Sequence, residues 1–74
     1  MTEKDLLSKA KKYLKDHYGE DTVSMDVTGN DVSEKGDGIF SVDCTVRVGS
    51  EESDWSKKFH FKAGNVVRMD WRMR

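Results

Sequence analysis

The clearest pattern in the chain is an alternation of apolar and polar residues between residues 38 and 48. The even positions hold the apolar side chains Phe40, Val42, Cys44, Val46 and Val48, and polar side chains separate them. A period of two predicts a β-strand with one face buried and the other face in water. We expect this strand to be central, with the other elements covering or extending it.

Residues 3 to 18 are predicted to form one amphipathic helix, because apolar residues recur at spacings of three and four. Thr2 and Asp5 suit a capping box at its start, with Asp in place of Glu, and Gly19 suits its end. The apolar face consists of Leu6, Leu7, Ala10, Tyr13, Leu14 and Tyr18.

The alternation returns over residues 22 to 28, and residues 22 to 33 are predicted to form one strand bent by a bulge. Its last apolar residue, Val32, is out of phase with the others, and an extra residue at Gly29-Asn30 would restore the phase as a β-bulge. The turn that follows is expected at residues 34 to 38, where two glycines permit positive φ. The residues expected to point inward are Val23, Met25 and Val27.

Two further strands are predicted at residues 55 to 62 and 66 to 74, where the alternation resumes. Their phase restricts how antiparallel strands can pair, because residues directly opposite each other share a face. The expected inward residues are Trp55, Phe59 and Phe61 in the first strand and Val67, Met69, Trp71 and Met73 in the second.

The phase of these strands predicts two hairpin registers. A four-residue loop at residues 50 to 53 sets Val48 opposite Trp55. A three-residue loop at residues 62 to 64, with its glycine left-handed, sets Trp55 opposite Trp71.

The elements together predict a two-layer α+β domain spanning residues 1 to 74, with the N-terminal helix packed on a four-stranded antiparallel meander sheet. The order α-β-β-β-β resembles the cystatin-like and NTF2-like folds, in which a sheet also covers a helix. The resemblance is one of topology only, and it implies no function.

Length and composition describe a small domain with an ionic surface. The chain has 74 residues, of which 36% are charged. A single cysteine excludes an intrachain disulfide, and the inward phase of Cys44 indicates packing rather than reactivity. The N-terminus has no long apolar run, so we expect neither a signal peptide nor a membrane span, and a cytoplasmic location.

Basic residues gather in the last twenty positions, which hold six Lys or Arg against one acidic residue, although the whole chain has a net charge of −1. The expected registers set Lys58 opposite Arg68, and facing like charges are unfavourable unless an anionic partner neutralises them. Alternatively, these long side chains simply extend into water and discourage edge association. The candidate basic face consists of Arg47, Lys58, His60, Lys62, Arg68 and Arg72.

Catalytic chemistry is not expected. The same registers set Asp43 opposite His60, a pair that would orient a general base, but Cys44 faces the other side and no nucleophile lies with them. His17, Cys44 and His60 fall on separate elements or faces, so we assign no metal site, no cofactor and no catalytic residue.

The apolar side of the sheet is longer than the helix that covers it, at about 30 Å against about 24 Å. Some apolar surface at the end of the last strand is therefore expected to stay uncovered, unless Tyr13, Leu14 and Tyr18 cover it fully. This strand is also a sheet edge, open to pairing with a second copy. The candidate dimer or apolar patch consists of Trp55, Met69, Trp71 and Met73.

These observations predict a small non-catalytic interaction module whose basic face contacts an acidic protein partner or anionic ligand. The alternative is a structural homodimer, or a binder of a small apolar ligand, that uses the end of the sheet near Trp71 and Met73. Non-specific nucleic-acid binding ranks last, because the aromatic residues of the strands take the inward phase and bases stack on exposed aromatics.

Overall fold

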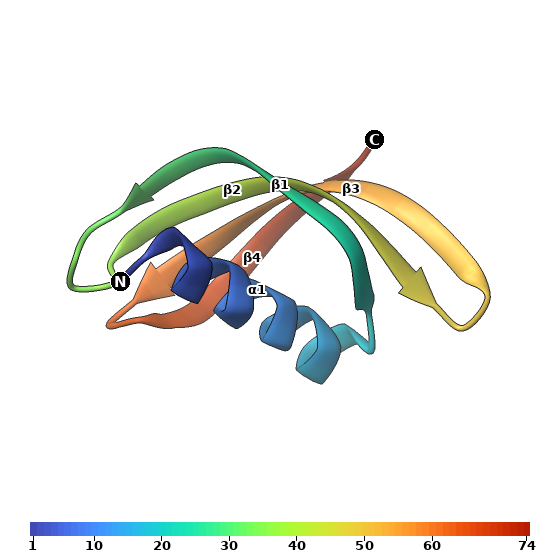
Figure 1. Ribbon diagram of the computed structural model, residues 1–74, viewed down its shortest axis with the longest axis horizontal. Coiled ribbons are helices and arrows are strands. Elements are labelled where there is room, and N and C mark those ends of the chain that lie inside the picture. Colours follow the sequence, from blue (N-terminus) through green and yellow to red (C-terminus); the bar gives the residue numbers. More distant parts are fainter.

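One helix packs against one face of a four-stranded antiparallel sheet in the computed structural model, which describes residues 1 to 74. The strands neighbour one another in chain order, so the predicted α+β meander is confirmed. The sheet arches over the helix, and the β2–β3 hairpin extends past the C-terminal end of the helix (Figure 1). The elements are α1 (Glu3–Tyr18), β1 (Asp21–Val32), β2 (Gly38–Val48), β3 (Glu51–Lys62) and β4 (Asn65–Met73).

Both ends of α1 are defined by the predicted signals. The hydroxyl of Thr2 accepts the N–H of Asp5 at 3.2 Å, and the Asp5 carboxylate accepts the N–H of Thr2 at 3.1 Å. These bonds satisfy N–H groups that have no partner inside the helix. Hydrogen bonding of the Asp5 carboxylate to Thr2, first of all to its backbone N–H, lowers the pKa of Asp5. Gly19 ends the helix with a φ of 65°, and the next N–H, of Glu20, donates to the carbonyl of Leu14. No helix in the structure is long and apolar enough to cross a membrane.

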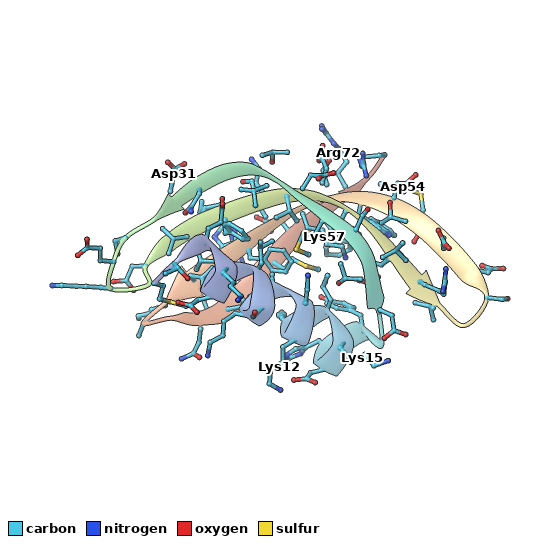
Figure 2. The ribbon with its side chains drawn as sticks, in the orientation of Figure 1. Lys12, Lys15, Asp31, Asp54, Lys57 and Arg72 are labelled. Atoms are coloured by element: carbon cyan, nitrogen blue, oxygen red, sulfur yellow. The ribbon has the colours of Figure 1, made fainter.

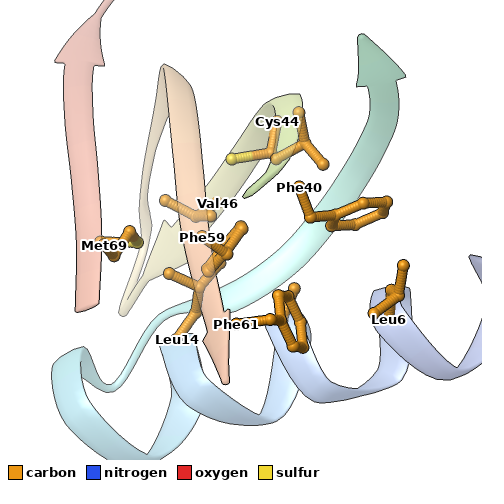
Figure 3. Close-up of a cluster of buried hydrophobic side chains, with 10 residues drawn as sticks. Leu6, Leu14, Phe40, Cys44, Val46, Phe59, Phe61 and Met69 are labelled. Atoms are coloured by element: carbon orange, nitrogen blue, oxygen red, sulfur yellow. The ribbon is translucent and has the colours of Figure 1, made fainter. Parts of the chain in front are cut away.

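The core lies between α1 and the inner face of the sheet, which is the face toward the helix. The alternation in β2 is confirmed, because its even-numbered residues from 40 to 46 are all buried. The rings of Phe40 and Phe61 meet edge to face, with centroids 6.2 Å apart. The ten core residues are Leu6, Ala10, Leu14, Phe40, Val42, Cys44, Val46, Phe59, Phe61 and Met69 (Figure 3).

Two bulges bend β1, where one was predicted. Its pairing with β2 shifts at Val23 and again at Thr28, so the expected extra residue falls just before Gly29 rather than at Gly29-Asn30. The shift has the predicted consequence, because Val32 is partly buried and packs against the core. The bulge at Val23 was not predicted, and it leaves that side chain 50% exposed.

The prediction of a four-residue loop between β2 and β3 is wrong. Val48 pairs with Glu51 across a two-residue turn, so Trp55 lies opposite Cys44 rather than Val48. The shorter turn keeps every residue on its predicted face, because the register moves by an even number of residues. It also adds residues 51 to 54 to the ladder, where Arg47 pairs with Glu52.

The prediction of a three-residue loop between β3 and β4 is also wrong. The turn has two residues, Ala63 and Gly64, with φ values of 51° and 82°. The extra residue that the phase requires lies inside β4 at Val67, as a bulge. Trp55 is therefore opposite Met73, and Trp71 is opposite residue 57.

Four residues that were expected to point inward are instead more than half exposed. Val67 is 61% exposed because it is the bulged residue of β4. Val48 at 53%, Trp71 at 60% and Met73 at 62% keep the inner phase but are exposed, toward the end of the sheet that α1 does not cover. The expected uncovered apolar end of β4 is therefore present.

Replacing Gly38 by Ala should destabilise the fold more than the same change at Gly49. Gly38 has a φ of 140°, and a Cβ there would lie 2.0 Å from the carbonyl oxygen of Asp31 on the neighbouring strand. Gly49 also has a positive φ, of 63°, but a Cβ would meet nothing within 4 Å. We expect Gly49→Ala to cost about 1 kcal/mol and Gly38→Ala more than about 2 kcal/mol. Urea unfolding of both variants measures this, and equal losses would contradict the close approach.

Candidate functional site

The predicted basic residues lie on the outer face of the sheet, which is the face away from α1. The corrected registers place acidic residues among them. Lys58 lies opposite Asp70 rather than opposite Arg68. Arg47 pairs with Glu52 at 2.6 Å, and this hydrogen bond raises the pKa of Arg47. The outer face is therefore mixed in charge rather than uniformly basic.

His60 pairs with Asp70, not with Asp43 as expected. Its Nε2 lies 2.8 Å from Asp70 Oδ2, and an Arg68 guanidinium nitrogen lies 3.6 Å from the same oxygen. The hydrogen bond from His60 is the main cause that lowers the pKa of Asp70. Arg68 and His60 do face each other across the strands, and both contact the same oxygen of Asp70. This arrangement is an exposed charge cluster with no nucleophile in it.

Asp43 lies in a row of residues that crosses the whole sheet. It faces Asp26 on β1 and Ser56 on β3, and Ser56 in turn faces Arg72 on β4. The hydroxyl of Ser56 donates to Asp43 Oδ1 at 2.7 Å. The side chain of Arg72 has neither an ion pair nor a hydrogen bond within the chain, and it projects from the outer face in Figure 2. A shallow hollow of about 600 Å³ lies over this region, lined by Thr28, Val42, Asp43, Ser56, Lys57, Lys58, Asp70, Trp71 and Arg72.

Lys62 is the remaining member of the predicted basic face. It pairs with Asn65 beside the β3–β4 turn, and it is exposed. Lys62 is the last residue of β3, whereas Glu52, the partner of Arg47, lies at the start of that strand. The structure thus spreads the six basic residues along the sheet instead of gathering them at one point.

A buried ion pair at the end of α1 was not predicted. Lys57 is only 3% exposed, and its Nζ lies 2.9 Å from Oε1 of Glu20, which is 13% exposed. The ammonium group also lies 5.6 Å from the centre of the Tyr18 ring and 5.2 Å from the centre of the Trp55 ring. In Figure 2 Lys57 lies between the sheet and the helix. The available signal was its odd position between Trp55 and Phe59, which assigns a lysine to the inner face.

Cys44 is fully buried on the inner face, as predicted from its phase. Burial raises the pKa of its thiol, so the group stays neutral and packs as a small apolar side chain. His17 lies on α1 and His60 on the outer face, so the three candidate metal ligands do not converge. No group of three or more His, Cys, Asp or Glu residues is placed to hold a metal ion.

The predicted apolar patch divides into a buried and an exposed part. Met69 is buried in the core, and Trp55 is half-buried with its indole N–H bonded to Ser53 at 2.8 Å. Trp71 and Met73 are exposed on the inner face of β4. They lie beside Lys57 and Trp55 respectively, their partners across the β3–β4 ladder.

The backbone of β4 leaves hydrogen-bonding groups open along the edge of the sheet. The N–H of Arg74 donates to the carbonyl of Asp54 at 3.0 Å, so even-numbered residues of this part of β4 direct their backbone groups toward β3. The odd-numbered residues Met69, Trp71 and Met73 therefore direct their N–H and C=O groups away from the sheet. The open backbone groups and the exposed apolar side chains belong to the same strand, which is the arrangement that receives another strand.

Breaking the buried pair by removing the charge of Glu20 should destabilise the fold, because the Lys57 ammonium would stay buried without a counter-charge. We expect Glu20→Gln to cost about 3 kcal/mol in urea unfolding. The double variant Glu20→Gln with Lys57→Met should recover most of this loss. The matched control is the exposed pair of Lys12 and Asp16 at 2.6 Å, where Asp16→Asn should cost less than about 0.5 kcal/mol. Equal effects at both pairs would contradict the importance of burial.

Replacing His60 by Phe should raise the pKa of Asp70 part of the way back to its ordinary value, because the hydrogen bond from His60 is the largest cause of the shift. The pKa of Asp70 is depressed in the folded state. The pair therefore stabilises the fold above pH ~4, and this contribution is lost as the pH falls through the lowered value. Carboxyl NMR titration measures the change. Asp5 is the internal control, since its lowered pKa depends on Thr2 and should not move.

Comparison with known proteins finds no match, whether with protein families, curated proteins or solved structures. The resemblance to the cystatin-like and NTF2-like folds therefore rests on element order alone. The two faces of the sheet and the edge of β4 are the features from which a function can be inferred.

Proposed function

We propose that the chain is a small non-catalytic binding module whose β4 edge receives a further β-strand. The incoming strand would bond to the open backbone groups of Met69, Trp71 and Met73, and would cover the exposed side chains of Trp71 and Met73. The observation that carries this proposal is the coincidence of open backbone and exposed apolar surface on one strand. Main-chain bonds supply affinity in this mode of recognition, and side-chain contacts supply specificity.

The two edges of the sheet support the choice of β4. β1 is the other edge, and its two bulges interrupt the regular backbone that an added strand needs. β4 has one bulge, at Val67, and its register is regular from Arg68 to Met73. Proteins protect sheet edges with inward-pointing charges, yet the inner phase of β4 carries none from Met69 to Met73.

A strand fits this surface better than a small apolar ligand does. Pockets for such ligands are concave and mainly apolar. The hollow over the outer face is shallow, and seven of its nine lining residues are polar or charged.

Binding of an acidic partner at the outer face is the weaker proposal. Its main support in the sequence was the pairing of Lys58 with Arg68, and Lys58 instead lies opposite Asp70. Lys58, Lys62 and Arg72 still lack an ion pair within the chain, so a contact with an anionic partner is compatible with the geometry. The arrangement does not require such a partner for stability.

Peptides selected from a random nine-residue library should bind the β4 edge. In amide NMR spectra recorded at low micromolar protein concentration, we expect the N–H groups of Met69, Trp71 and Met73 to shift and to gain protection from hydrogen exchange. Asp70 and Arg72 should change less, because their N–H groups already bond to β3.

The variant Trp71→Ala should weaken peptide binding at least tenfold, since one buried aromatic contact commonly contributes 2 kcal/mol or more, about a thirtyfold change. Val23→Ala is the control, because Val23 is similarly exposed on the other edge strand. Peptides whose binding shifts only outer-face residues such as Lys58 and Lys62 would overturn the proposal in favour of the basic face.

A further inference from the structure

We infer that the strand received at the β4 edge is β4 of a second copy of this chain, paired antiparallel about a twofold axis at Trp71. This inference rests on the proposed function and names its partner. The two sheets would join into one eight-stranded sheet with both helices on the same face.

The faces of the strand restrict where the axis can lie. Opposite residues in a continuous antiparallel sheet share a face, so a symmetric pair must place one residue opposite its own copy. An axis at Met69 would set Trp71 against the partner's Val67, which is the bulged residue. The twofold axis must therefore pass through the regular part of β4, at residue 70, 71, 72 or 73.

Charge, together with the free guanidinium of Arg72, selects Trp71 among these positions. An axis at Asp70 sets two aspartates against each other. An axis at Arg72 sets two arginines against each other and pairs Asp70 with the partner's Arg74, but the guanidinium of Arg74 already donates to the carbonyl of Cys44 at 3.3 Å within its own chain. An axis at Met73 sets Arg72 against the partner's Arg74. An axis at Trp71 sets Asp70 of each copy against Arg72 of the partner subunit, which gives two opposite-charge pairs.

The backbone geometry agrees with this register. Trp71 would exchange hydrogen bonds with the partner's Trp71, and Met69 with the partner's Met73, because these odd-numbered residues have open N–H and C=O groups. Three such pairs would form about six backbone hydrogen bonds. Asp70 and Arg72 would then be a non-hydrogen-bonded pair, in which Cα atoms are only about 4.5 Å apart and side chains meet closely.

The side chains also suit a symmetric partner. Arg72 has no ion pair within its own chain, so its charge is available. On the inner face the two Trp71 rings would meet, flanked by Met73 and the partner's Met69. The nearby Lys57 is already neutralised by Glu20, so no free charge opposes this apolar contact.

The net charge of −1 causes little repulsion between copies. Only the two pairings of Arg68 with the partner's Arg74, at the exposed ends of the ladder, are unfavourable.

Charge reversal in two separate variants tests the register. In Asp70→Arg the dimer would face two Arg–Arg pairs, and in Arg72→Asp two Asp–Asp pairs. We expect sedimentation to show a dimer for the unchanged protein and at least tenfold weaker association for either variant alone. An equimolar mixture of the two variants should associate again, because each contact in the mixed dimer joins Arg to Asp. Circular dichroism and thermal unfolding confirm that each variant is folded.

A cysteine scan in the Cys44→Ala background gives a second readout. Trp71→Cys should form a disulfide between copies under mild oxidation, because hydrogen-bonded pairs have Cα atoms about 5.5 Å apart. Asp70→Cys and Arg72→Cys should form less than a tenth as much. Cross-linking at residue 70 or 72 instead of residue 71 would overturn the proposed axis.

The outcomes separate this inference from the proposed function. A protein that stays monomeric at about 1 mM, yet binds selected peptides through Met69, Trp71 and Met73, would overturn the second copy and support the proposed function. A dimer that is unchanged by both charge reversals would place the interface elsewhere and overturn the inference. A monomer whose β4 edge binds no peptide would overturn both.

Discussion

A helix that is shorter than the sheet it covers determines most of this structure. The sixteen residues of α1 extend about 24 Å, whereas a strand of twelve residues extends about 40 Å. The left-handed Gly19 stops the helix and directs the chain back into β1, and the next residue is Glu20. At this point the inner face changes from an apolar core to a buried ion pair, in which Glu20 neutralises Lys57. Beyond the pair the inner face has no helix to cover it, and Trp71 and Met73 are exposed.

The elements of the fold could be predicted from the sequence because each depends on local signals. Apolar spacing defined the helix, and Thr2, Asp5 and Gly19 defined its ends, so that the predicted bounds match those observed. Alternation identified the strands, with β3 four residues longer than expected, and it assigned the face of β2 correctly. Phase does not define register, however, because any shift of the pairing by an even number of residues keeps each residue on its face. The β2–β3 hairpin differed in this way, and the bulge at Val67 altered the β3–β4 hairpin.

The candidate sites differed in how much they depended on register. The basic face required Lys58 opposite Arg68, and the actual pairing with Asp70 removes that reason. The apolar end of β4 required only the phase of Trp71 and Met73 and the length of α1, and both are as expected. Lys57 was overlooked although its odd position assigned it to the inner face. A lysine is unsuitable for a core unless a counter-charge lies beside it, and Glu20 is 37 residues away in the chain.

The asymmetry between the two sheet edges is the feature that the fold alone does not explain. Both edges belong to a small domain with a limited core, where an unprotected edge exposes the protein to unwanted association. β1 is protected by two bulges and by the chain entering it directly from α1. β4 combines a regular backbone, exposed Trp71 and Met73, and outer-face charges of both signs at Arg68, Asp70 and Arg72. A chain that needed only to stay monomeric would gain from a lysine at position 71, whereas the large aromatic ring there costs solubility unless something covers it. The exposure of this ring on one edge, beside a protected second edge, is consistent with a partner that binds β4 and leaves β1 free.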